Sequence, residues 1–234
     1  FVKNVKTAWE NCDDERLMTM GIPPTFPNTG YGYIEFKEGR KNDAFEVIRF
    51  TEKPDYPTAK KFYESGNYLW NSGMFLWKAS AIVKAFELYA NEMFNLFNAG
   101  YDKLNTTDEQ AFLSDNYPKS ENISIDFAIM ENAKKIGVVK AEFDWNDLGT
   151  WGSLYDQLPK NDEQNVIVHA DVLAEGSNGN MIRSKTGKKV VIDGLQDLII
   201  IDSDDILMIA PQSKEQTIKQ KRNRAIEEYG EEMK

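Results

Sequence analysis

The segment from Trp145 to Trp151 holds one acidic residue, Asp147, between an amide and a leucine–glycine pair, with an indole at each end. Trp is scarce in this chain, because only 5 of its 234 residues are Trp. Large indole rings can anchor a loop, and Gly149 allows a sharp turn or a close approach to a ligand. The pattern therefore predicts a carboxylate held rigidly at the lip of a pocket. The alternative is a packed turn that carries a surface Asp.

A second group of polar residues lies upstream of this segment. Glu52 and Lys53 are adjacent, and Pro54 marks the end of their strand, where both side chains can reach the rim of a pocket. The alternative for this pair is a surface ion pair, which is worth about 0–1 kcal/mol. Asn71 offers both a donor and an acceptor, which suits recognition of a ligand hydroxyl. Its alternative role is to satisfy backbone groups in a turn.

These residues belong to four motifs in a fixed order. The motifs are residues 24–35 with the loop Gly30-Tyr31-Gly32-Tyr33, then Phe50-Thr51-Glu52-Lys53-Pro54, Leu69-Trp70-Asn71-Ser72-Gly73-Met74-Phe75, and the segment from Trp145 to Trp151. Together they resemble the sugar-binding half of the sugar-1-phosphate nucleotidylyltransferases. Within that family the nearest group is the mannose-1-phosphate guanylyltransferases, or GDP-mannose pyrophosphorylases. The resemblance extends across essentially the whole chain.

The resemblance implies a reaction in which GMP passes from GTP to mannose-1-phosphate, giving GDP-mannose and pyrophosphate, with Mg²⁺ as cofactor. It also implies that Asp147 binds the metal, so that Asp147 and Lys53 are the expected catalytic residues. Lys53 would neutralise the sugar phosphate, while Glu52 would accept hydrogen bonds from sugar hydroxyls. Two alternatives stay open: a transferase that joins glucose-1-phosphate to UTP or dTTP, and a non-catalytic regulatory subunit that binds sugar nucleotides.

The glycine-tyrosine loop completes the predicted substrate site. Gly32 would let its backbone N–H meet the sugar directly, with Tyr31 and Tyr33 as walls, alongside Asn71; the alternative for the loop is ordinary strand packing. One departure from the family pattern is Asn28, which stands where an acid is usual and receives no role here. A second departure is that the phosphate-binding glycine-rich loop and the Pro-Lys pair are missing. We therefore expect a fragment that lacks the first strands of the nucleotide-binding sheet and is inactive alone.

The elements that must position these residues follow from hydrophobic spacing. We predict strands at 16–21, 32–37, 44–52 and 70–77, and helices at 1–12, 56–66, 80–98, 108–116 and 124–133. In the last helix Asp126 suits the first turn, a role that we favour over a catalytic one. The fold class is α/β: a three-layer nucleotide-diphospho-sugar transferase-like domain over residues 1–160, with its N-terminal strands missing.

Residues 161–234 are predicted to form a small C-terminal β-rich region. Its strands are expected at 165–173, 188–195 and 198–211, followed by a helix at 213–233. His169, the only histidine of the chain, is expected within the first of these strands. No internal repeat is strict enough to indicate a solenoid.

Composition narrows the possible partners. The formal net charge of −10 argues against nucleic acid and anionic membranes, which select basic surfaces. No apolar run approaches the roughly 18 residues of a membrane helix. Cys12 is the only cysteine, which excludes an intramolecular disulfide and is compatible with the cytoplasm. The resemblance, and not the composition, implies GTP and mannose-1-phosphate as partners and a homodimer as the assembly.

Overall fold

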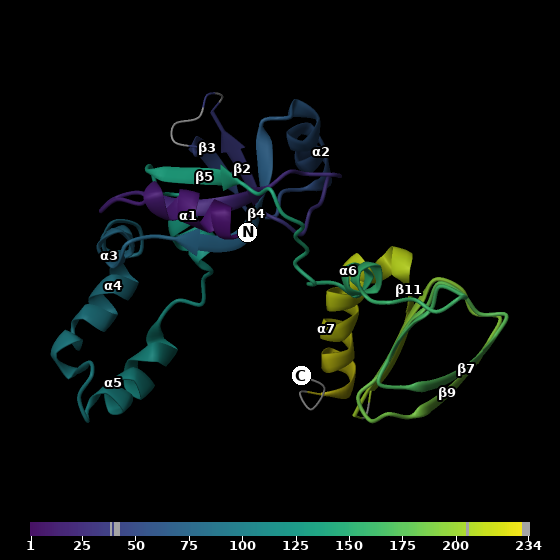
Figure 1. Ribbon diagram of the computed structural model, residues 1–234. Helices are drawn as coiled ribbons and strands as arrows, with labels where there is room; N and C mark the ends of the chain where they lie inside the picture. Colours follow the sequence, from purple (N-terminus) through teal and green to yellow (C-terminus); the bar gives the residue numbers. More distant parts are fainter. Residues whose placement is uncertain (38, 40–42, 205, 231–234) are drawn as a thin grey trace. The chain divides into compact units, whose positions relative to one another are not determined.

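The computed structural model describes residues 1–37, 39, 43–204 and 206–230. It divides into two compact units, Phe1–Trp145 and Asn146–Lys234 (Figure 1). The α/β class predicted from the sequence is confirmed. The sequence predicted a division after residue 160, whereas helix α6 (Trp151–Gln157) packs with the core of the second unit.

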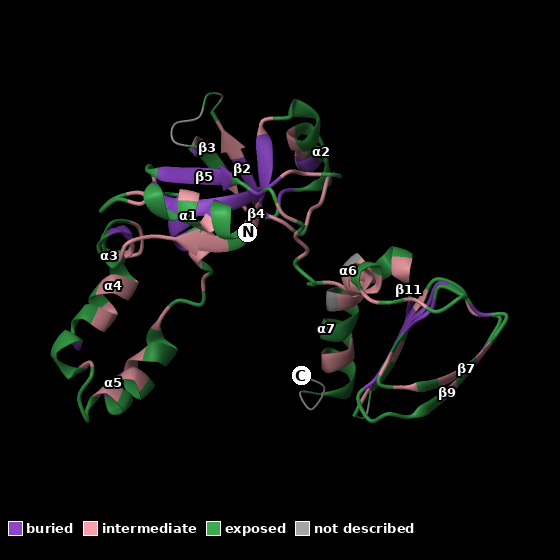
Figure 2. Cartoon of the chain, viewed as in Figure 1, coloured by how far each residue is buried: buried purple, intermediate pink, exposed green. Residues whose placement is uncertain are grey.

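Five strands form the centre of the first unit. They are β1 (Leu17–Ile22), β2 (Tyr33–Phe36), β3 (Phe45–Thr51), β4 (Tyr68–Leu76) and β5 (Ile136–Lys140). In the order β1-β4-β2-β3-β5 they close into a barrel, because β5 pairs with both β1 and β3. Every residue of β1 is buried, and Figure 2 shows that β5 is mostly buried as well.

Strand β5 was not predicted, and the glycine within it lies against the side chain of Met18. A Cβ on Gly137 would lie 2.5 Å from the sulfur of Met18 on the neighbouring strand β1. A larger residue at this position would therefore require the side chain of Met18 to move. The apolar residues on either side, Ile136 and Val138, belong to the main core of the unit.

The described part of the first unit has five α-helices. They are α1 (Val2–Glu10), α2 (Tyr56–Ser65), α3 (Ala79–Tyr89), α4 (Asn91–Asn98) and α5 (Glu109–Asn116), with short 3₁₀ turns η1 (Tyr101–Lys103) and η2 (Tyr117–Lys119). Of these helices, α1 and α2 contact the barrel strands, whereas α4 and α5 extend away from the barrel (Figure 1). The single helix predicted over 80–98 is wrong, because Ala90 leaves helical geometry with φ −133° and ψ 51°. The helix predicted at 124–133 is instead a π-helix, η3 (Asp126–Met130). No described helix is long and apolar enough to cross a bilayer.

Helix α2 shows how local chemistry sets an element's ends. Its N-cap Asp55 accepts a 3.0 Å hydrogen bond from the backbone N–H of Thr58. Its C-cap Gly66 has φ 74°, a left-handed conformation that favours glycine. These caps hold α2 directly after the Glu52-Lys53-Pro54 motif.

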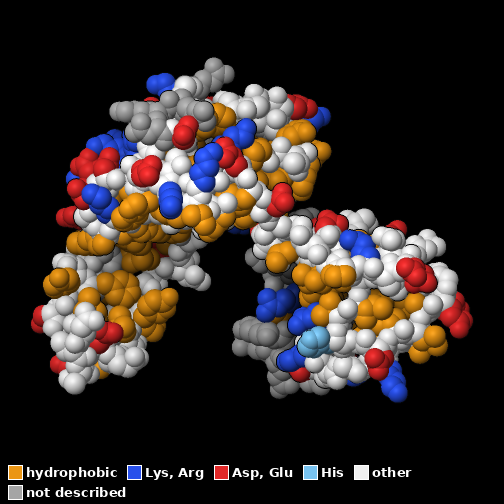
Figure 3. All heavy atoms as spheres, viewed as in Figure 1, with side chains coloured by type: hydrophobic (Ala, Val, Ile, Leu, Met, Phe, Trp, Pro, Cys, Tyr) orange, Lys and Arg blue, Asp and Glu red, His pale blue; other side chains and the backbone are white. Residues whose placement is uncertain are grey.

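The visible face of the molecule mixes acidic, basic and apolar side chains (Figure 3).

The second unit is a short parallel β-helix, named the coil below, in which successive turns of β-strands pair in parallel. Its strands are β6 (Val166–Val168), β7 (Asp171–Glu175), β8 (Met181–Ser184), β9 (Lys189–Asp193), β10 (Leu198–Ser203) and β11 (Ile206–Pro211). Strands β6, β8 and β10 pair in parallel in one sheet, and β7 pairs in parallel with β9 in another. Successive turns of the chain therefore stack, and β11 closes the first sheet by pairing antiparallel with β10. The sequence shows no repeat strict enough to indicate a solenoid, yet the strands of this unit stack in successive turns.

Buried asparagines join the turns of the coil. Asn180 Nδ2 donates to Asn165 Oδ1 at 2.9 Å and to the carbonyl oxygen of Leu195 at 3.0 Å, while its Oδ1 accepts from the Leu198 N–H at 3.0 Å. The two asparagines are 15 residues apart, whereas Asn180 and Leu198 are 18 apart. This unequal spacing hid the repeat in the sequence.

The corners of the coil need left-handed backbone. Gly176 and Gly194 stack at one corner with φ 55° and 66°. His169 has φ 53° and lies between β6 and β7, so the prediction of a strand residue is wrong. The coil ends in a 3₁₀ segment, η4 (Gln212–Thr217), and helix α7 (Ile218–Tyr229). Residues 231–233 of the predicted terminal helix lie outside the described residues.

Candidate functional site

Glu52 is the centre of the candidate site in the first unit. It directly follows β3, and its side chain is only 6% exposed. One carboxylate oxygen, Oε1, accepts a hydrogen bond from Lys53 Nζ. The other, Oε2, is buried and has no hydrogen-bond partner among the described residues. A buried acceptor without a donor costs about 1–3 kcal/mol, so this oxygen is suited to a donor brought by a ligand.

Gly32 makes room for this carboxylate. A Cβ on Gly32 would collide with Oε2 of Glu52 and would lie 3.2 Å from Cβ of Asn71. The backbone of Gly32 is also tied to Asn71, because the Asn71 N–H donates to the Gly32 carbonyl at 2.7 Å. Three predicted site residues from separate motifs therefore meet at one place.

Lys53 supplies the positive charge of the site. Its side chain is 59% exposed, in contrast to that of Glu52. The backbone of Lys53 has φ 45°, a conformation that non-glycine residues rarely adopt. Such strain, of order 1–3 kcal/mol, persists only where neighbouring contacts hold it. The corner at Glu52 and Lys53 is thus a fixed feature of the fold, with the ammonium group facing solvent.

Two further carboxylates reach this corner, from Asp126 at the start of η3 and from Glu131 directly after its end. Asp126 Oδ1 accepts a hydrogen bond from Asn71 Nδ2 at 2.9 Å, and Glu131 Oε1 accepts one from the Glu52 backbone N–H at 2.8 Å. The sequence interpretation favoured a helix-terminus role for Asp126 over a catalytic one, and it overlooked Glu131. No spacing in the sequence links either residue to strands β3 and β4, so only the fold reveals the contacts.

The electrostatics of Glu52 follow from this arrangement. Burial raises the pKa of the Glu52 carboxyl above its ordinary value, and the nearby charges of Asp126 and Glu131 raise this pKa further. The hydrogen bond and positive charge of Lys53 oppose the increase. A donor from a ligand would favour the charged form of Glu52 in the same way as Lys53.

The glycine-tyrosine loop is held by its own turn. Asn28 Oδ1 accepts from the Gly30 N–H at 2.7 Å, and the hydroxyl of Tyr33 exchanges two 2.9 Å hydrogen bonds with the Asn28 backbone. Tyr33 is completely buried, so the prediction that it forms a pocket wall is wrong. Tyr31 is half-buried and packs edge-on against Trp70 and Trp145 at ring distances of 5.1 and 5.4 Å. Asn28 therefore has a structural role in place of the acid usual in the family.

Asp147 belongs to the second unit. Its Oδ1 accepts from the Gly149 N–H at 3.1 Å, and a Cβ on Gly149 would lie 2.5 Å from its Oδ2. Gly149 therefore makes room for the carboxylate, as Gly32 does for Glu52. The two indoles of the motif anchor separately: Trp145 packs in the first unit and Trp151 in the core of the second.

The expected Mg²⁺ is compatible with Asp147. Among the described residues, no group of three His, Cys, Asp or Glu side chains is arranged to hold a metal. Mg²⁺ does not need such a group, because it commonly takes one or two carboxylates and completes its shell with phosphate oxygens and water. An exposed carboxylate such as that of Asp147 fits this mode of binding.

Comparisons with known proteins show the family of the chain. The sequence pattern of the nucleotidyl transferase family matches residues 1–164. Mannose-1-phosphate guanylyltransferase RfbM of Salmonella typhimurium is 34% identical over 225 residues, which cover 94% of this chain and 46% of that protein. The mannose-1-phosphate guanylyltransferase of Escherichia coli K12 is 32% identical, again over 94% of this chain and 46% of that protein. The chain thus spans about half the length of these relatives.

A solved structure shares the fold. The mannose-1-phosphate geranyltransferase of Thermus thermophilus aligns with a TM-score of 0.80 over 95% of this chain and 64% of that chain. At 23% sequence identity this likeness concerns the fold alone.

Proposed function

The chain belongs to the nucleotidyl transferase family, and on this basis we propose that it carries the sugar-phosphate-binding part of a mannose-1-phosphate guanylyltransferase. One observation carries the proposal. Glu52 presents a buried carboxylate oxygen without a partner among the described residues, beside the exposed ammonium group of Lys53. A sugar phosphate brings the two complementary groups, hydroxyl donors and a phosphate anion. The names of the relatives support mannose-1-phosphate as that ligand.

In the proposed reaction a phosphate oxygen of mannose-1-phosphate attacks the α-phosphorus of GTP. The new phosphorus–oxygen bond forms as the bond to the β-phosphate breaks, and pyrophosphate leaves with that electron pair. Glu52 and Asn71 hold the sugar hydroxyls, Gly32 lets the sugar approach the backbone, and Lys53 neutralises the sugar phosphate. Because two anions must meet, catalysis depends on charge neutralisation and positioning, with no covalent nucleophile.

We propose Asp147 as a protein ligand for Mg²⁺ in this reaction. When bound, the ion neutralises phosphate charge and orients the triphosphate. Tyr31 supports the loop that carries Gly32 through its packing against Trp70 and Trp145. The proposal further includes a homodimer in the cytoplasm, with which the single Cys12 is compatible.

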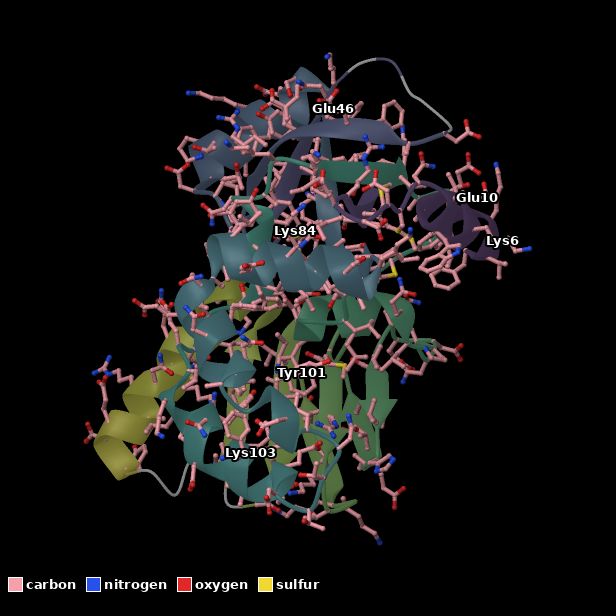
Figure 4. The ribbon with its side chains drawn as sticks, turned by 90° about the vertical axis from the view of Figure 1, so that its left-hand side faces the viewer. Lys6, Glu10, Glu46, Lys84, Tyr101 and Lys103 are labelled. Atoms are coloured by element: carbon pink, nitrogen blue, oxygen red, sulfur yellow. The ribbon has the colours of Figure 1, made fainter. Side chains whose placement is uncertain are left out.

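Calorimetry tests the binding part of the proposal. Mannose-1-phosphate, glucose-1-phosphate and inorganic phosphate are titrated into the chain, and mannose-1-phosphate should bind most tightly. Lys53→Met should weaken both sugar phosphates about equally, by roughly tenfold for a charge-assisted contact. Lys6→Met is the matched control, since Lys6 is exposed on α1 (Figure 4) and should have no effect. Absence of binding to every sugar phosphate would contradict the proposal.

Turnover tests the reaction itself. Pyrophosphate release is measured on the natural protein that contains this sequence, with GTP and mannose-1-phosphate and, separately, with UTP or dTTP and glucose-1-phosphate. The first pair should be the better substrates. Preference for the second pair would identify a glucose-1-phosphate enzyme, and sugar-nucleotide binding without any turnover would identify a regulatory subunit.

A further inference from the structure

We propose that the π-turn, defined as Asp126–Glu131, is the positioning element of the sugar site, with Asp126 and Glu131 as its two positioning residues. This inference rests on the proposed function, because it concerns the residues assigned to sugar binding. The two ends of the π-turn contact the backbone of Glu52, which follows β3, and the side chain of Asn71, which lies in β4.

The first contact holds the Glu52 corner. Strand β3 ends at Thr51, so the backbone N–H of Glu52 lies beyond the strand's own pairing. Glu131 Oε1 accepts this N–H at 2.8 Å. The next residue, Lys53, has the strained φ of 45°. Glu131 therefore fixes the backbone at the point where two proposed ligand-binding side chains leave the strand.

The second contact holds the amide of Asn71. Its Nδ2 donates to Asp126 at 2.9 Å, while its Oδ1 accepts from the Gly73 N–H at 3.1 Å. Both ends of the amide are thus engaged, and its orientation is set. An Asn whose amide is fixed in this way presents a defined donor and acceptor pattern to a sugar hydroxyl.

The π geometry explains why one turn reaches both places. In an α-helix, residues five apart lie about 140° apart around the axis, because each residue advances by about 100°. In a π-helix the hydrogen bond runs from i to i+5, as in the 2.9 Å bond from the Glu131 N–H to the Asp126 carbonyl. Asp126 and Glu131 therefore come close to the same side of the turn. An α-helical turn would direct them apart.

The opposite side of the π-turn anchors it. Ala128, Ile129 and Met130 are buried in the main core of the first unit. Glu131 itself is exposed apart from its bond to Glu52. Substitutions at Glu131 can therefore test positioning without creating a cavity in the core.

Two substitutions separate positioning from charge. Glu131→Gln keeps an oxygen acceptor for the Glu52 N–H and removes the charge, whereas Glu131→Ala removes both. We expect the Ala variant to bind mannose-1-phosphate about tenfold more weakly and the Gln variant to stay within about twofold of the wild-type chain. Asp126→Ala should reduce the preference for mannose-1-phosphate over glucose-1-phosphate, because the Asn71 amide is then free to rotate. Glu10→Ala is the control, on an exposed position of α1 (Figure 4).

Amide hydrogen exchange gives a readout that needs no ligand. The Glu52 amide should exchange at least about tenfold faster in Glu131→Ala than in wild type, and Glu131→Gln should restore its protection. Equal exchange and equal affinity in Ala and wild type, or a Gln variant as impaired as Ala, would overturn the inference. If the wild-type chain binds no sugar phosphate, the proposed function fails, and the exchange rates alone then decide whether the π-turn holds the corner.

Discussion

Glu52→Gln should stabilise the chain while weakening its ligand binding. The substitution keeps the shape of the side chain but removes a negative charge from a side chain that is only 6% exposed. In the variant the amide nitrogen takes the place of the unpartnered Oε2 and stays buried without a partner, so the gain comes only from removing the charge, whose burial costs about 1–3 kcal/mol more than that of a neutral amide. The lost ion pair costs less, about 0–1 kcal/mol, because the side chain of Lys53 is 59% exposed and can be solvated.

The expected net gain is about 1 kcal/mol in the free energy of unfolding near neutral pH. For a chain of this size that corresponds to a rise in Tm of about 2–4 °C. The gain should depend on pH in a defined direction. Because burial raises the pKa of Glu52, the native state binds the proton more tightly than the unfolded state. The destabilisation caused by the buried charge of Glu52 is therefore absent below the unfolded-state pKa of about 4.3. It grows as the pH rises through the native-state pKa of Glu52.

The assay is thermal unfolding of wild type, Glu52→Gln and the control Glu10→Gln at several pH values between about 4 and 7, which bracket the unfolded pKa. In parallel, calorimetry should show that Glu52→Gln binds mannose-1-phosphate about 10- to 100-fold more weakly, since hydrogen bonds to charged groups contribute about 1.5–3 kcal/mol. A Gln variant that is less stable than wild type near neutral pH, or a gain that does not shrink as the pH is lowered, would refute the reasoning.

Other substitutions test the remaining features. Gly32→Ala should lower the free energy of unfolding by about 1–3 kcal/mol and reduce sugar-phosphate affinity, because its Cβ meets the Glu52 carboxylate; unchanged calorimetric values would contradict this. Asp147→Asn should reduce turnover of the natural enzyme by about 10²–10³-fold, and near-normal kcat at saturating Mg²⁺ would leave it as a turn residue. Asn180→Ala should destabilise the second unit by at least about 2 kcal/mol in urea unfolding, since three hydrogen bonds to neighbouring turns are lost. A smaller loss would show that the asparagines are not what holds the turns together.

Sequence reasoning succeeded where the relevant signal is local. The ends of α2 follow from Asp55 and Gly66, and the four motifs directed attention to Gly32, Glu52 and Asn71, which the fold brings together. It failed where a contact joins residues that are far apart in the sequence. The contact of Asp126 with Asn71 spans 55 residues and depends on a π-helix, whose spacing no hydrophobic period reveals.

The coil was missed for a related reason. Its turns differ in length, so the signal is carried by single residues such as Asn165 and Asn180 and not by a constant period. The left-handed corner at His169 had no glycine to mark it, and the alternating apolar residues before it indicated a continuous strand. Stacking of one turn on the next, which the sequence does not display, is what stabilises each corner.

The separate anchoring of Trp145 and Trp151 gives the protein a built-in optical label. Trp151 is the only tryptophan after residue 145, and it packs in the second unit's core with the guanidinium of Arg183 5.8 Å from its ring. Replacing the other four tryptophans by phenylalanine would leave a chain whose fluorescence reports one half alone. Its emission would shift to longer wavelength when the coil opens, while the single thiol of Cys12 could carry a dye that follows the other half. Thermal unfolding of the two units can thus be followed separately in one sample.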